Sequence, residues 1–186
     1  MELVQWQKID EENGLVMPWF THPSLEWIKK QDWRDKNILM FGAGLGDAWL
    51  AKRCKTLHVV ERNHDWLYKA KLYSDANNGN VQYDFRPCND GDGWAAYYTA
   101  MPEGFEPDII INDDAYRTEV CQMAVDYFGK KTFGGILICD NWVQSFVWIS
   151  PKAEEIMKPY PITVFEQADH TDNDGVNKWK TVAFHI

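Results

Sequence analysis

Three alternate glycines, Gly42, Gly44 and Gly46, are followed by an acid at Glu61. Alternate glycines let a ligand approach the backbone, and the N–H groups that open the next helix point at it. Glu61 lies 19 residues after Gly42 (61 − 42), where a ribose-binding acid follows the second strand of a nucleoside-binding βαβ unit. The spacing indicates a nucleoside site, although a glycine turn can also be a plain tight connection.

The residues after the glycines indicate which nucleoside fits. A dinucleotide motif, G-x-G-x-x-G, would need a small residue at position 47 or 49, but the sequence has Asp47 and Trp49 there. A carboxylate in the first helical turn suits the helix dipole but repels a pyrophosphate. The ligand is therefore expected to lack phosphate and to carry a positive end. S-adenosylmethionine, with its sulfonium and ammonium groups, fits this description.

Acidic side chains also follow two apolar runs further along the chain. Asp113 and Asp114 end the first run, and Asp140 with Asn141 ends the second. Because the carboxyl ends of parallel strands face the binding crevice, these side chains are placed for chemistry. Adjacent carboxylates also cap helices, so a structural role is the alternative.

Alternating apolar runs and helical patterns are expected to position these residues. Strands are predicted at 38–41, 56–61, 81–85, 107–114, 133–141, 162–166 and 178–186. Helices are predicted after Ser24, at 47–53 and 61–73, at 94–101, through about Lys130, and before Met157. The last two strands suit an antiparallel pair at the edge of the sheet. The pattern predicts an α/β fold with a mostly parallel seven-stranded sheet and helices on both faces.

The glycine turn and the acid after the second strand resemble the class I S-adenosylmethionine-dependent methyltransferases. The run Val60-Glu61, with His64-Asp65-Trp66 and Tyr68 after it, is similar to one branch of them. The segment 134–141, Gly-Gly, a strand and Asp-Asn, is similar to the catechol and caffeoyl-CoA O-methyltransferases. Met40 stands where the family usually has an acid. The resemblance implies a Rossmann-like fold and methyl transfer by in-line displacement.

The resemblance also implies roles for individual residues. Asp113 and Asp140 are the expected catalytic acids, and with Asn141 they form a candidate Mg²⁺ site, since hard cations take oxygen ligands. The catalytic lysine of those O-methyltransferases is not evident, because Tyr116 and Arg117 follow the strand-four acids. The residues expected to bind S-adenosylmethionine are Gly42, Gly44, Gly46, Asp47, Glu61 for the ribose, Asp90 for the adenine and Asp113 near the methyl group. Asp92 is an alternative to Asp90, and the turn 89–93 is equally well explained as a helix cap.

The methyl acceptor is not written in the sequence. The tetrad N-P-P-Y of base-amino methyltransferases is absent, because Asn112 to Tyr116 read Asn-Asp-Asp-Ala-Tyr. A formal charge of −9 opposes attraction to nucleic acid, so a small molecule methylated on oxygen or nitrogen is expected. His22 is a candidate general base or a polar surface residue. An aminopropyl transferase and a catalytically silent nucleoside-binding module are the alternatives to a methyltransferase.

The length and composition of the chain indicate what broad class of protein it is. With 186 residues the chain fits one domain, 1–186, with an entry segment 1–36, a cofactor-binding core 37–141 and a closing part 142–186. Four cysteines without a C-x-x-C pair indicate neither a zinc site nor a disulfide scaffold, so a cytoplasmic location is expected. No leader pattern and no apolar run of about 18 residues is present, so no membrane contact is expected.

Overall fold

The central strands of the sheet are short apolar runs, and helices alternate with the strands along the chain up to the last two strands. The computed structural model describes residues 8–77, 80–88, 94–142, 151–168 and 178–186. Its strands are β1 (Asn37–Phe41), β2 (Thr56–Glu61), β3 (Val81–Phe85), β4 (Ile109–Asn112), β5 (Ile136–Cys139), β6 (Ile162–Ala168) and β7 (Lys178–His185). Its helices are α1 (His22–Lys29), α2 (Asp47–Ala51), α3 (His64–Asn77), α4 (Trp94–Tyr98), α5 (Arg117–Phe128) and α6 (Pro151–Met157).

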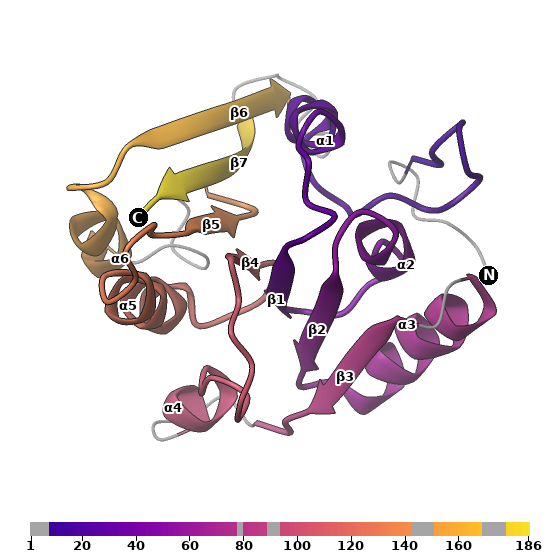
Figure 1. The fold of residues 1–186 in the computed structure, drawn as a ribbon, viewed down its shortest axis with the longest axis horizontal. Helices are drawn as coiled ribbons and strands as arrows, with labels where there is room; N and C mark the ends of the chain where they lie inside the picture. The colour runs from indigo at the N-terminus through magenta and orange to yellow at the C-terminus, as the bar shows by residue number, and fades with distance from the viewer. Residues whose placement is uncertain (1–7, 78–79, 89–93, 143–150, 169–177) are drawn as a thin grey trace.

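All seven strands form one sheet in the order β3-β2-β1-β4-β5-β7-β6 (Figure 1). The first five pair in parallel, with Phe41 opposite Val60 on one side and Asn112 on the other. β7 lies antiparallel between β5 and β6. The predicted fold class, a mostly parallel sheet with an antiparallel C-terminal pair, is confirmed.

Helices cover both faces of the sheet, as Figure 1 shows. One face packs against α1, α2 and α3, whose buried residues include Ile28, Trp49 and Ala70. The other packs against α4, α5 and α6, with Tyr98 and Phe128 in its core. The central strands β1 and β4 are apolar because both faces are covered, which is typical of parallel sheets. No helix in the described part of the chain is long and apolar enough to cross a membrane.

The strand order reverses at β1, which lies between β2 and β4. In open α/β sheets, ligands bind outside the carboxyl ends of the strands at such a switch point. The segments that follow β1, β2 and β4 therefore surround the expected site. The N-terminal segment also reaches this region, because Pro18 lies directly against Gly46 of the glycine turn.

Candidate functional site

The glycine turn packs differently at each of its three glycines. Gly42 has a φ of +94°, and a Cβ there would lie 2.6 Å from the Asp113 carbonyl oxygen. Gly46 is equally restricted, since its Cβ would lie 2.4 Å from the Pro18 Cα. A Cβ on Gly44 would meet nothing closer than Asp47 Oδ1 at 3.9 Å. Gly44 is therefore the glycine that leaves space beside the backbone.

The Glu61 carboxylate joins the glycine turn to the turn after β2. Its Oε2 accepts a hydrogen bond from the Ala43 N–H at 2.8 Å, and its Oε1 accepts from Arg62 N at 2.8 Å and Asn63 N at 2.6 Å. The residue is only 4% exposed, and burial raises its pKa against the effect of these N–H groups. Each carboxylate oxygen has two lone pairs, so Oε2 can also accept a bond from a ligand hydroxyl.

Asp47 points toward the protein rather than away from it. Its carboxylate accepts hydrogen bonds from Gly44 N at 3.0 and 3.1 Å and from the Tyr83 hydroxyl at 3.0 Å. The side chain is fully buried, and this burial raises its pKa to about 7 despite those donors. The structure thus gives Asp47 a role in closing the glycine turn, and its contact with a cofactor stays a prediction.

Asp113 differs from the other acids of the site in the contacts of its carboxylate. It is half-buried, and its carboxylate forms no hydrogen bond or ion pair with any residue in the described ranges. Burial and the neighbouring Asp140 raise its pKa well above the usual range, and the Arg117 guanidinium lowers it by less. A carboxylate in this situation favours a positive group in the adjoining space.

Asp140 lies at the end of β5 with no exposed surface. Its carboxylate accepts hydrogen bonds from Trp179 Nε1, at 3.2 Å to both oxygens, and from the Thr181 hydroxyl. Thr181 Oγ1 in turn accepts the Thr21 N–H at 3.0 Å. Burial raises the pKa of Asp140 to about 7, although Thr181, Trp179 and Arg117 oppose the shift. Asp140 thus ties β5 to β7 and to the N-terminal segment.

The predicted magnesium site of Asp113, Asp140 and Asn141 is not supported. Within the described ranges, no three His, Cys, Asp or Glu side chains form a group that could hold a metal ion. The physical reason is that Asp140 uses its oxygens for Trp179 and Thr181.

A cavity of about 680 Å³ opens at the switch point, within the size range of ligand pockets. Of the predicted site residues, Gly42, Glu61 and Asp113 line it, whereas Gly44, Gly46, Asp47, Asp140 and Asn141 are not among its lining residues. Asp90 and Asp92 lie outside the described residues. The other lining residues are Ala43, Arg62, Asn63, Asp65, Trp66, Lys69, Cys88 and Asp114.

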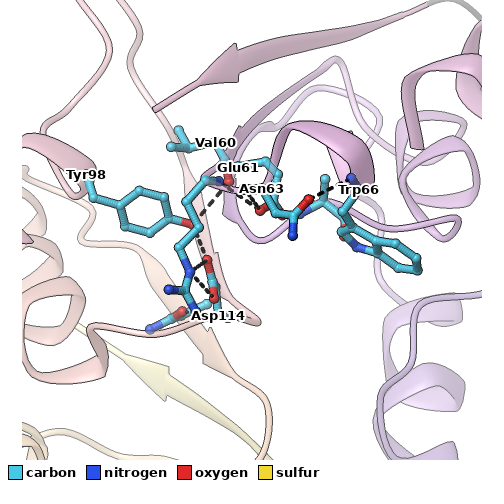
Figure 2. Close-up of polar contacts among 9 residues, drawn as sticks. Val60, Glu61, Asn63, Trp66, Tyr98 and Asp114 are labelled. Atoms are coloured by element: carbon cyan, nitrogen blue, oxygen red, sulfur yellow. Dashed lines mark hydrogen bonds and ion pairs between the residues drawn. The ribbon is translucent and has the colours of Figure 1, made fainter. Parts of the chain in front are cut away.

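Several residues of the site carry no role in the sequence analysis (Figure 2). Arg62 Nε lies 3.2 Å from both oxygens of Asp114, and the Tyr98 hydroxyl donates to the same carboxylate. The Trp66 indole N–H donates to the Ala43 carbonyl oxygen. Trp66 stands within the motif that resembles methyltransferases. Arg62 and Tyr98 have no local signal, because their partner Asp114 lies 52 and 16 residues away along the chain.

No protein-family model matches the sequence, and no curated protein matches it significantly. Solved structures do match. N-methyltransferase NodS from Bradyrhizobium japonicum is 12% identical with a TM-score of 0.63, over 88% of this chain and 93% of that chain. The Bacillus cereus O-methyltransferase, in complex with S-adenosylhomocysteine, is 17% identical with a TM-score of 0.56, over 81% and 74%. An rRNA methylase from Streptococcus thermophilus is 13% identical with a TM-score of 0.56, over 88% and 94%.

At these identities the likeness shows the fold. The chain has the Rossmann-like fold of the class I S-adenosylmethionine-dependent methyltransferases, which was predicted from the glycine turn and the order of the elements. The acceptors in these neighbours differ, since N-, O- and rRNA methyltransferases all share the fold.

Proposed function

We propose that the protein is an S-adenosylmethionine-dependent methyltransferase. The observation that carries the proposal is the cavity at the switch point, whose lining brings together Gly42, the buried acid Glu61 and Asp113, a carboxylate without a partner among the described residues. Glu61 suits ribose hydroxyls, and Asp113 suits a positive group. A ligand with a ribose and a sulfonium or ammonium group matches both requirements, whereas a pyrophosphate would meet the charges of Glu61, Asp113 and Asp114.

The residues present therefore fit S-adenosylmethionine. Gly42 and Ala43 would border its backbone-facing side, Glu61 would hold the ribose hydroxyls, and Asp113 would face the positive end. When bound, the cofactor supplies a methyl group activated by the sulfonium. The protein's part is to orient the reactants and to exclude water, which can supply much of the rate enhancement. Asp113 would be a catalytic acid of the site, and Asp140 would assist it through its effect on the pKa of Asp113.

A small molecule methylated on oxygen or nitrogen is the proposed acceptor. The support is the formal charge of −9, which opposes binding of a phosphate backbone, together with the carboxylates of the cavity wall. These carboxylates favour an acceptor that is neutral or positively charged.

Isothermal titration with S-adenosylhomocysteine tests the cofactor part of the proposal. We expect saturable binding with one site per chain and no binding of NADH under the same conditions. Transfer of labelled methyl groups to a panel of small alcohols, phenols and amines, with an RNA arm, tests the acceptor part. Absence of S-adenosylhomocysteine binding would refute the proposed function, and methylation of RNA alone would refute the small-molecule acceptor.

A further inference from the structure

Tyr98 does not line the cavity itself, but it donates its hydroxyl hydrogen to Asp114, whose carboxylate does. The residue belongs to α4 and is fully buried, with its ring 5.7 Å from that of Phe41 and 5.5 Å from that of Tyr116 between centroids. Its hydroxyl reaches Asp114 Oδ2 and lies 3.4 Å from the Val60 carbonyl oxygen. A fully buried ring that packs against two other aromatic rings presents its hydroxyl in a fixed position.

Asp114, whose position is fixed by Tyr98, in turn forms an ion pair with Arg62. Both oxygens of Asp114 lie 3.2 Å from Arg62 Nε, and the side chains are 15% and 30% exposed. Both residues line the cavity. Burial and the Asp114 charge raise the pKa of Tyr98, so the tyrosine keeps its proton and remains a donor.

The series of contacts ends at the acid proposed to bind the ribose. The backbone N–H of Arg62 donates to Glu61 Oε1 at 2.8 Å, and Glu61 Oε2 accepts from Ala43 N of the glycine turn. Figure 2 shows Tyr98 approaching Asp114 from one side, with Glu61, Asn63 and Trp66 on the other. A buried tyrosine on α4 is thus connected to the glycine turn through the ends of β4 and β2.

We infer that Tyr98 is a positioning residue for the nucleoside half of the ligand. By holding Asp114, it fixes the Arg62 side chain on the cavity wall and thereby the turn that carries Glu61. The inference rests on the proposed function, because it assigns the nucleoside to this part of the cavity. A tyrosine with only a packing role would affect stability without being coupled to Asp114 in ligand binding.

The variant Tyr98→Phe removes the hydroxyl and keeps the ring. Titration with S-adenosylhomocysteine and with 5′-methylthioadenosine, which share the nucleoside, is expected to give a dissociation constant about tenfold higher for both ligands, as loss of a hydrogen bond to a charged group predicts. Tyr127→Phe is the matched control. Its hydroxyl is also buried but has no hydrogen-bond partner among the described residues, so its removal is expected to leave binding unchanged.

A double-mutant cycle with Asp114→Asn tests whether Tyr98 acts through Asp114. We expect Tyr98→Phe to change the dissociation constant less than about twofold when Asp114 is already replaced, because coupled residues are not additive. Arg62→Gln changes the more exposed partner of Asp114. We expect it to give the same loss of affinity for S-adenosylhomocysteine, and this variant remains a test even if Tyr98→Phe folds poorly. Additive effects, or wild-type affinity in Tyr98→Phe, would overturn the inference alone. If the wild type did not bind S-adenosylhomocysteine, the proposed function and this inference would both be refuted.

Discussion

Pro18 packs directly on Gly46, so closely that a Cβ at position 46 would lie 2.4 Å from both the Cα and the N of Pro18. The N-terminal segment thus uses the third glycine of the turn as its docking point. The glycine motif predicts that all three glycines border a ligand, but in the structure each glycine has different neighbours. This difference can be tested by substitution.

Gly46→Ala is expected to destabilise the fold. The added methyl group overlaps the backbone of Pro18, which cannot move as a flexible side chain can, and overpacking of this kind costs about 1 to 3 kcal/mol. Urea unfolding followed by tryptophan fluorescence measures the loss. Unchanged stability would show that the N-terminal segment does not dock on the turn in solution.

Gly44→Ala is expected to behave in the opposite way. The new Cβ would lie 3.9 Å from both Asp47 Oδ1 and Gly46 N, which is ordinary van der Waals contact, so stability should stay within about 0.5 kcal/mol of the wild type. Binding of S-adenosylhomocysteine should weaken at least about tenfold, because the methyl group occupies space next to the backbone. Parallel titration and urea unfolding check both parts, and equal affinity would remove Gly44 from the cofactor site.

Glu61→Gln is expected to reduce affinity for S-adenosylhomocysteine by about ten- to a hundredfold. The amide places a donor where Oε1 or Oε2 accepts from backbone N–H groups, and it loses the charge that strengthens a bond from a ribose hydroxyl. Isothermal titration gives the change. Asp75→Asn on α3 is the control, since Asp75 pairs with Lys71 at the surface and does not line the cavity, and the affinity of this variant should equal that of the wild type.

Asp113→Asn is expected to weaken S-adenosylmethionine more than S-adenosylhomocysteine. The two ligands differ by the methyl group and the positive charge of the sulfonium, so a carboxylate near that charge discriminates between them. The ratio of their dissociation constants should change by about tenfold, measured by competition titration. A ratio equal to that of the wild type would place Asp113 away from the sulfonium.

The raised pKa of Asp140 leads us to expect that the stability of the protein depends on pH. Its pKa is about 7 in the folded protein, against an ordinary value of 3.8, so the folded protein keeps a proton that the unfolded chain releases. The free energy of unfolding should therefore fall as the pH rises from about 4 to about 7 and then level off. Asp47 contributes in the same direction, since its pKa is also about 7.

Asp140→Asn resembles the protonated acid and should remove part of this fall. Each pKa unit corresponds to about 1.4 kcal/mol. Between pH 4 and pH 8 the free energy of unfolding should therefore fall by a few kcal/mol less in the variant than in the wild type. Urea unfolding at four pH values provides the comparison. Parallel profiles for the two proteins would mean that Asp140 is charged throughout.

The fold could be predicted because its signals are local. Each of the central strands β1 and β4 is a short apolar run that is buried on both faces. The bounds of β2 and β3 agree with the predicted 56–61 and 81–85. Helix α2 ends earlier than predicted, at Ala51, and Lys52 occupies its C-cap position.

The site was less predictable because the direction of an acidic side chain depends on distant partners. Asp47 is turned inward by Tyr83, 36 residues further along the chain, and Asp140 by Trp179, 39 residues away. Asp113 has no such partner in the described part of the chain, and it lines the cavity. A carboxylate at the end of a strand can be recognised in the sequence, but whether it faces a ligand is decided by residues that the motif does not contain.

The hydrogen bond between Thr21 and Thr181 joins residues that are 160 positions apart. A ribosome must therefore synthesise the chain as far as Thr181 before this bond can tie the N-terminal segment to β7. The earlier strands can pair during synthesis, since β1, β2 and β3 are neighbours in both sequence and sheet. The nascent protein is thus expected to acquire its sheet gradually, and the contact between the N-terminal segment and β7 only when β7 arrives between β5 and β6.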